Sequence, residues 1–273
     1  MFKSTTVHYL RTKYAETITQ QEVAMAIEAG SSTYYQAKRG IVQNGLVLHL
    51  DFSEKKSYDG GASLKNLAKP NKNGTLVNSP LSRRSRDGGR SIVFDKTDDY
   101  INLDSLSTYS TGFYSGGVSY CIWYKAPNPM TYNYSQGLFV YQPHGGYWYS
   151  TCAGMNTYQY KVRAICYNTN GQSYQTVTSA TSINDNSWHY LVNTFDPDDS
   201  LMRIYIDGEL DATDDTEIVA FVAYSNGTTY IGGRSGGNQP TEGEIAMAQL
   251  YTRALSANEI SQNFNATRHR FGV

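Results

Sequence analysis

Short stretches in which hydrophobic and polar residues alternate make up most of the chain after Gly45. In the first of these, Leu46, Leu48 and Leu50 occupy every second position, a period of two that is typical of a strand with one buried face. Comparable stretches follow at residues 74–78, 90–95, 99–103, 117–126, 136–142, 160–168, 173–181, 188–196, 201–210, 228–233 and 244–252. Many short strands separated by turn residues, with no helical pattern between them, predict an all-β sandwich or barrel.

Two local signals mark turns and ends near the C-terminus. An Asp-Gly pair at 207–208 stands between two apolar runs and predicts a two-residue hairpin turn. Ser256 begins a capping box, in which its hydroxyl accepts a hydrogen bond from the amide of Glu259 and the glutamate reaches back. Ile260 and Phe264 are four residues apart and share one face of the helix that follows. The predicted end of the chain is therefore a core strand and a short packed helix.

The segment 1–44 lacks this strand pattern and is predicted to be separate from the domain at 45–273. Residues 16–30 predict a short helix, and residues 31–44 are predicted to form a polar linker. A helix of about three turns is marginal alone in water, so it must pack on the domain, on copies of itself or on a partner. We expect an attachment segment, with packing across its own sandwich as the alternative. The residues expected to make its buried contacts are Val23, Met25 and Ile27.

The composition is that of a β-rich globular protein. The chain has 273 residues, 40% of them hydrophobic, with 24 Tyr and 24 Gly; Tyr favours strands and Gly supplies turns. A formal net charge of −1 gives no electrostatic reason to expect nucleic acid or an anionic membrane as partner. No window reaches the ~18 apolar residues of a membrane span, and the N-terminus lacks the apolar run of a secretory signal. Three cysteines without zinc-like spacing fit synthesis in a reducing cytoplasm.

Several segments occur in the order expected of a laminin G-like, concanavalin A-like domain. They are GLVLHLDF, NGTLVNSP, SIVFDKTDDYINL, NSWHYLVNTFD, MRIYIDGEL, YIGGR and GEIAMAQLYTRALSANEI. The chain resembles this family over roughly residues 45–267. The resemblance implies a jelly-roll sandwich of two antiparallel sheets with short helical segments at its ends, in agreement with the strand pattern. Trp188, a bulky residue at a strand start, is expected to anchor the core.

The last segment, EISQNFNATRHRFGV at residues 259–273, is similar to the ending of many tailed-bacteriophage structural proteins that carry this domain. That similarity implies a virion component of a tail fibre or other appendage, of the neck or of the capsid exterior, made in the host cytoplasm. Its expected partners are other virion proteins and sister copies in a homo-oligomer. The alternative function is a lectin-like module that binds a glycan on the host surface.

The sandwich fold also occurs in glycoside hydrolases, and those that retain configuration need two carboxyl groups about 5 Å apart. Hydrolases of this fold usually carry Glu-x-Asp-x-Glu on one strand, and the nearest match here begins with Glu242 and Glu244. The next alternate positions are Ala246 and Ala248, which cannot ionise. We therefore expect no catalytic residue and no enzymatic activity.

Calcium is a possibility that the resemblance raises, because many laminin G-like domains bind this ion at a sheet edge and Ca²⁺ takes six to eight oxygen ligands. Acidic pairs occur at 98–99 and 214–215, and the densest acidic group is Asp196, Asp198 and Asp199. Consecutive acidic residues more often serve turns. We expect no cofactor, and these three aspartates are the candidate ligands if calcium binds.

Aromatic residues are concentrated between residues 130 and 174. Aromatic rings stack on the apolar faces of sugars, and Tyr hydroxyl groups add hydrogen bonds; the same amphipathic character favours contacts with proteins. Most of these rings are expected to pack within the sheets. The residues expected to contact a ligand are Tyr132, Tyr134, Tyr147, Trp148 and Tyr149.

Overall fold

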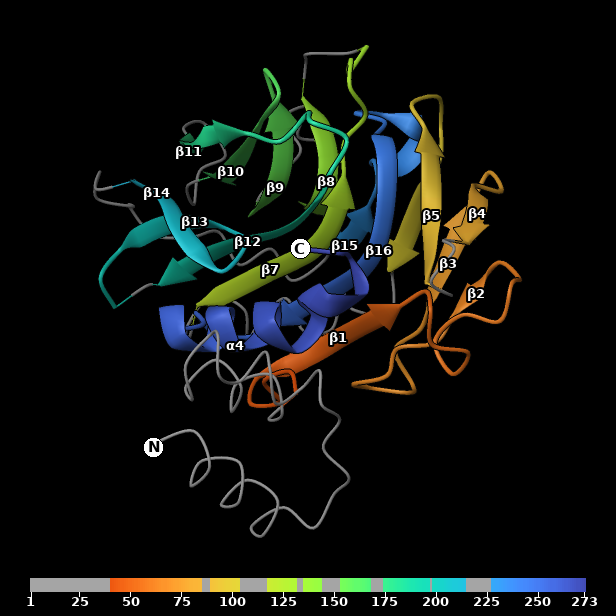
Figure 1. Cartoon of the computed structure of the whole chain (residues 1–273), viewed down its shortest axis with the longest axis horizontal. Helices are drawn as coiled ribbons and strands as arrows, with labels where there is room; N and C mark the ends of the chain where they lie inside the picture. The colour runs from red at the N-terminus through yellow and green to blue at the C-terminus, as the bar shows by residue number, and fades with distance from the viewer. Residues whose placement is uncertain are drawn as a thin grey trace, which may run out of the picture.

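The computed structural model describes residues 40–84, 89–103, 117–131, 135–143, 153–167, 174–196, 198–214 and 227–273. Within them the strands form two eight-stranded antiparallel sheets, and one α-helix, α4 (Ala257–Thr267), follows the last strand (Figure 1). This confirms the predicted jelly-roll-like sandwich. The predicted N-terminal helix lies outside the described residues. No helix in the described part of the chain is long and apolar enough to cross a membrane.

The first sheet has the strand order β14-β13-β12-β7-β16-β5-β4, and β1 pairs with β16 beside this path. Its strands are β1 (Leu46–Asp51), β4 (Leu81–Arg84), β5 (Arg90–Asp95), β7 (Val118–Lys125), β12 (Trp188–Asp196), β13 (Leu201–Ile206), β14 (Glu209–Asp214) and β16 (Glu242–Tyr251). The predicted Asp207-Gly208 hairpin joins β13 to β14, with positive φ at both residues, as a two-residue turn of this kind requires.

The second sheet has the order β11-β10-β9-β8-β15-β6-β3-β2. Its strands are β2 (Ser63–Leu64), β3 (Gly74–Val77), β6 (Tyr100–Leu103), β8 (Gln136–Pro143), β9 (Ala153–Tyr158), β10 (Lys161–Tyr167), β11 (Tyr174–Ser182) and β15 (Gly227–Ile231). The strand pattern in the sequence predicts most of them. It misses β2, β9 and, in the first sheet, β4, whose four side chains are all exposed and therefore carry no alternation.

The first sheet is buried on both of its faces. In β7, Tyr120, Ile122 and Tyr124 pack in the core between the sheets, whereas Cys121 and Trp123 pack in a second hydrophobic cluster on the outer face. Such a strand is almost uniformly apolar, and all but its last residue are buried. A sandwich of two sheets buries only the inner face of each sheet. The second cluster therefore requires another element to cover the outer face.

That element is α4, which lies against the outer face of the first sheet (Figure 1). Ser256 and Glu259 form the predicted capping box, in which the serine N–H donates to the glutamate carboxylate at 3.0 Å. Ile260 is fully buried, and the ring of Phe264 stacks on Trp123 with centroids 5.9 Å apart. The prediction that Ile260 and Phe264 hold the C-terminal helix to the sandwich is confirmed.

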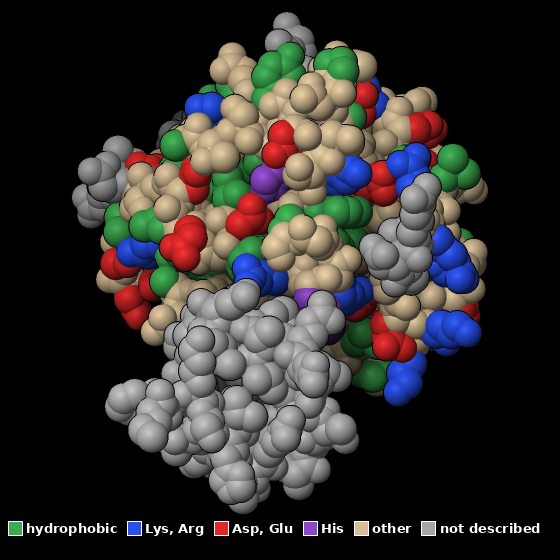
Figure 2. Space-filling view, in the orientation of Figure 1, with side chains coloured by type: hydrophobic (Ala, Val, Ile, Leu, Met, Phe, Trp, Pro, Cys, Tyr) green, Lys and Arg blue, Asp and Glu red, His purple; other side chains and the backbone are tan. Residues whose placement is uncertain are grey.

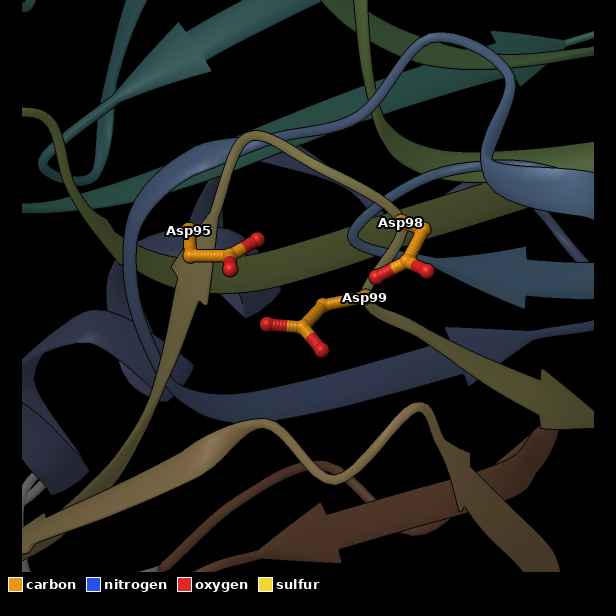
Figure 3. Close-up of side chains that lie close together, drawn as sticks. All are labelled: Asp95, Asp98 and Asp99. Atoms are coloured by element: carbon orange, nitrogen blue, oxygen red, sulfur yellow. The ribbon is translucent and has the colours of Figure 1, made fainter.

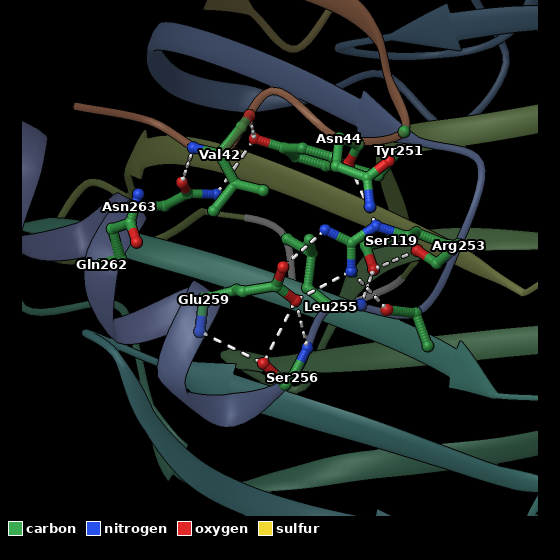
Figure 4. Close-up of polar contacts among 12 residues, drawn as sticks. Val42, Asn44, Ser119, Tyr251, Arg253, Leu255, Ser256, Glu259, Gln262 and Asn263 are labelled. Atoms are coloured by element: carbon green, nitrogen blue, oxygen red, sulfur yellow. Dashed lines mark hydrogen bonds and ion pairs between the residues drawn. The ribbon is translucent and has the colours of Figure 1, made fainter. Parts of the chain in front are cut away.

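A polar network joins α4 to the residues that precede β1 (Figure 4). The Asn263 side chain accepts from the backbone N–H of Val42 at 2.8 Å and donates to the Tyr251 hydroxyl at 3.1 Å, and that hydroxyl donates to the Val42 carbonyl at 3.0 Å. The Gln262 amide donates to the Gly40 carbonyl at 2.9 Å. The end of the predicted linker is therefore bonded to the domain.

Arg253 fixes the turn between β16 and α4 (Figure 4). Its guanidinium donates to both carboxylate oxygens of Glu259, at 2.6 and 2.8 Å, and its Nε donates to the Asn44 carbonyl at 3.0 Å. The hydrogen bond from Arg253 lowers the pKa of Glu259 to about 2. The turn, the capping box and the chain before β1 thus form one connected unit.

Candidate functional site

All of the aromatic residues predicted to contact a ligand lie outside the described residues, as do those predicted to attach the chain to a partner. They are Tyr132, Tyr134, Tyr147, Trp148 and Tyr149 for the ligand, and Val23, Met25 and Ile27 for the attachment. Both assignments stay predictions.

The two carboxylates at the start of β16 are held by neighbouring side chains. Glu242 accepts from the backbone N–H of Thr131 at 2.9 Å and from its hydroxyl. Glu244 is only 8% exposed, accepts from the Ser91 hydroxyl at 2.7 Å and forms an ion pair with Arg83. Each of these carboxylates is therefore fixed in place by hydrogen-bond donors of neighbouring residues.

A β-bulge in β16 corrects one expectation about this strand. The register between β16 and β7 shifts between Ile245 and Met247. An extra residue at a bulge reverses the faces that the following residues occupy. Ala246 therefore packs in the outer cluster and Ala248 in the core between the sheets, so the two do not share one face as strict alternation predicts.

The aspartates named as candidate calcium ligands serve local structure. Asp196 accepts from the backbone N–H of Asp198 at 3.1 Å, and Asp199 accepts from that of Leu201 at 3.0 Å. Asp199 also forms an ion pair with Arg203. Within the described ranges, these carboxylates do not form a group whose oxygens could share a metal ion.

A different group of carboxylates does come together, at the turn between β5 and β6 (Figure 3). Asp95, Asp98 and Asp99 each place a carboxylate oxygen within 4.8 Å of the others; we call them the aspartate cluster. Burial, with the charge of Asp95 as the next cause, raises the pKa of Asp99 to about 6. Three oxygens would supply part of the six to eight that calcium takes. Asp95 also accepts from the backbone N–H of Thr97 at 2.8 Å, which is an ordinary turn contact.

A pocket of about 300 Å³ opens on the outer face of the first sheet, beside the C-terminal segment. Its floor includes one cross-strand row, in which Trp188 of β12 is paired with Lys125 of β7 and Lys125 with Glu244 of β16. Directly opposite residues of antiparallel strands share a face, so this row projects outward. Ala246, next along β16, also lines the pocket.

The C-terminal residues form one wall of this pocket. Arg270 donates to both carboxylate oxygens of Asp51, at 2.7 and 2.8 Å, which fixes the chain end to β1. The ring of Phe271 stacks on Trp123, with centroids 4.0 Å apart and planes 18° apart, and lies 5.2 Å from the ring of Trp188. Phe271 and Trp188 therefore give the pocket two adjacent aromatic rings.

Polar residues of β4 and β5 complete the pocket. Arg90 is held by a hydrogen bond from its backbone N–H to the Ser53 hydroxyl at 2.8 Å, and its guanidinium lies 5.1 Å from the ring centroid of Tyr58. Arg83 and Ser91, the partners of Glu244, line the same pocket. Figure 2 shows Lys and Arg side chains grouped over the β4 and β5 side of this view, with Asp and Glu side chains more frequent toward β13 and β14.

The position of Trp188 differs from the expectation that it anchors the core. Of the two tryptophans in the described ranges, the fully buried one is Trp123, whose indole N–H donates to the Thr267 hydroxyl at 2.9 Å. Trp188 is partly buried against the outer cluster and lines the pocket. Lys125 was not among the site residues predicted from the sequence. A signal was present, since Cys121, Trp123 and Lys125 follow at intervals of two and must share the outer face.

The family profile described as the concanavalin A-like lectin/glucanases superfamily, with laminin G-like members, matches residues 95–261, more than half of the chain. A search of curated proteins found no match.

Solved structures show the same fold. The binding domain of Paraclostridial Mosquitocidal Protein 1 matches with a TM-score of 0.61 at 14% identity, over 82% of this chain and 52% of that one. The botulinum neurotoxin serotype D ligand-binding domain, in complex with N-acetylneuraminic acid, matches with 0.57 at 13%, over 83% and 52%. Trypanosoma rangeli sialidase matches with 0.57 at 14%, over 82% and 33%. The chain thus spans about half or less of the length of these structures.

Proposed function

Because this chain belongs to the concanavalin A-like lectin/glucanases superfamily, we propose that it is a carbohydrate-binding, lectin-like module that binds its ligand without catalysis. The observation that carries the proposal is the pocket in which Trp188 and Phe271 stand beside charged and hydroxyl side chains. Ligand pockets combine an apolar wall with a few placed polar groups, and an aromatic ring can stack on the apolar face of a sugar.

The similar structures support a binding role. One is titled as a ligand-binding domain in complex with N-acetylneuraminic acid, and others are titled as binding or receptor-binding domains of toxins. At 13–16% identity these structures share the fold with this chain. The sugar bound in one of them therefore supports a carbohydrate as the class of ligand, but it does not indicate where a sugar binds on this chain.

The absence of catalysis is proposed from the carboxylates. Among the described residues that line the pocket, Glu244 is the one carboxylate, and it is bonded to Arg83 and Ser91. A retaining glycosidase needs a second carboxyl group about 5 Å away, and an inverting one needs it at roughly 6.5–9.5 Å. The lining residue next along the outer face is Ala246, which offers neither an acid nor a nucleophile.

A glycan array probed with the full chain, followed by calorimetry on the saccharides that bind, tests this proposal. We expect saturable binding that weakens at least about tenfold in Trp188→Ala, because stacking on an aromatic ring is lost. Tyr174→Ala is the matched control, since Tyr174 is 58% exposed on β11 of the other sheet. The proposal fails if no saccharide binds, and its non-catalytic part fails if the protein releases reducing ends from a bound polysaccharide.

A more specific proposal is that this module is a component of a phage particle. It rests on the similarity of residues 259–273 to the endings of phage structural proteins. The comparisons give no support to a phage origin. In that setting residues 1–44 would attach the module to the particle, to sister copies or to both. Detection of the chain by mass spectrometry in purified particles is the test, and particles that lack the chain would refute this setting.

A further inference from the structure

The pocket holds more positive charge than its neighbouring carboxylates neutralise. Four of its lining residues are cationic: Arg83, Arg90, Lys125 and Arg270. Glu244 forms an ion pair with Arg83, and Asp51 forms one with Arg270. Arg90 shares a strand face with Ile92 and Phe94 of the core between the sheets, and its guanidinium lies over Tyr58 of that core, so its charge is not on the outer face. Within the described part of the chain, two carboxylates thus face the three cations of the outer face, and the charge of Lys125 remains uncompensated.

The remaining cation, Lys125, is positioned by the fold. Lys125 is half-buried at the end of β7, in the row between Trp188 and Glu244. Glu244 is turned to Arg83 and Ser91, so Lys125 forms no ion pair within the described ranges despite its paired position.

We propose that this pocket selects an acidic saccharide, whose anionic group binds at Lys125 while a sugar ring lies against Trp188 and Phe271. The inference rests on the proposed function and names the ligand class for the same site. Hydrogen bonds between a cation and an anionic oxygen are stronger than neutral ones. A neutral saccharide would leave the charge of Lys125 uncompensated in a partly enclosed site.

Replacing Glu244 provides a second test, in which affinity is expected to rise rather than fall. Its carboxylate lies in the same row as Lys125, so it repels an anion bound there. Replacing it by glutamine keeps an acceptor for the Ser91 hydroxyl, removes the negative charge and releases Arg83 from its ion pair. Affinity for an acidic saccharide should therefore rise in Glu244→Gln and fall in Lys125→Met.

The experiment measures affinity by calorimetry for matched ligand pairs. The pairs are a galacturonic acid oligomer and its methyl ester, sialyllactose and lactose, and a sulfated oligosaccharide and its unsulfated form. Lys125→Met should weaken binding of the acidic member about tenfold and Glu244→Gln should strengthen it several-fold, while the neutral member changes little. Lys65→Met and Glu209→Gln are the controls, because both residues are exposed and lie outside the pocket. The carboxylated and sulfated arms show which anion is recognised.

The outcomes separate this inference from the function on which it rests. If acidic and neutral members bind equally and Lys125→Met has no effect, the inference is wrong and the carbohydrate-binding function stands. If Lys65→Met weakens binding as much as Lys125→Met, the effect is a non-specific electrostatic attraction of the acidic ligand to the protein, and the inference is also wrong. If no saccharide binds to the wild-type chain, the proposed function itself fails. Melting temperatures of all four variants show whether each is folded.

Discussion

Replacing Asn263 by alanine should destabilise the protein by about 3 kcal/mol, because this side chain joins three parts of the chain. Asn263 is fully buried on α4, accepts from the Val42 backbone N–H at 2.8 Å and donates to the Tyr251 hydroxyl at 3.1 Å. Alanine leaves the N–H of Val42 buried without its acceptor, which costs roughly 1–3 kcal/mol, and loses a second hydrogen bond worth about 1 kcal/mol. Tyr251 keeps the Val42 carbonyl as its acceptor, so its hydroxyl adds no further penalty.

Urea unfolding followed by tryptophan fluorescence measures this change. The midpoint should fall while the slope of free energy against urea stays unchanged, since a smaller slope would indicate a changed denatured state rather than a lost contact. Asn265→Ala is the matched control on the same helix, because Asn265 donates to the Ser261 carbonyl one turn away. If Asn263→Ala is no less stable than Asn265→Ala, the network between α4 and residues 40–44 does not stabilise the domain, and the reasoning fails.

Three further predictions concern stability and metals. The pKa of Asp99 is about 6 in the folded protein and ~3.9 in the unfolded chain, so the free energy of unfolding falls as pH rises between these values. Asp99→Asn should therefore raise the free energy of unfolding by about 2 kcal/mol above pH 6 and leave it unchanged at pH 4. Equal effects at the two pH values would refute this. A chain that begins at Gly45 should melt below one that begins at Gly40, because it lacks the hydrogen bonds of Val42; equal melting temperatures would contradict this. Removing divalent cations with EDTA should leave the melting temperature unchanged, and a fall that calcium restores, absent in Asp95→Asn, would instead place a cation at the aspartate cluster.

Local patterns in the sequence were sufficient for the fold class, an all-β sandwich or barrel, and the family resemblance added the jelly roll. Alternation predicts most strands because one face of each is apolar, and the pair at 207–208 predicts its hairpin because few residues adopt positive φ. The capping box at Ser256 predicts the start of α4 for a similarly local reason. Strands without a buried face, such as β4, could not be found in this way.

The pocket could not be predicted from the sequence because its residues meet only through strand register. Trp188, Lys125 and Glu244 become neighbours across three strands that are far apart in the chain, and register is set by the whole sheet. The bulge after Ile245 has no local signal in the sequence and reverses the faces of the residues that follow. Proximity in sequence does not by itself predict a cluster of carboxylates: Asp196, Asp198 and Asp199 do not converge within the described residues, whereas the turn between β5 and β6 brings Asp95 to Asp98 and Asp99.

The most direct test of the account is an NMR titration that follows the indole N–H signals of the protein's tryptophans with a saccharide selected on the glycan array. The chain has three tryptophans, Trp123, Trp148 and Trp188. Trp123 is buried and hydrogen-bonded to Thr267, and Trp148 belongs to the aromatic segment for which the sequence alone predicts the ligand contacts. We predict that the Trp188 signal shifts saturably while those of Trp123 and Trp148 stay in place. A saturable shift of Trp148 with Trp188 unmoved would contradict the account and place the ligand on the other surface.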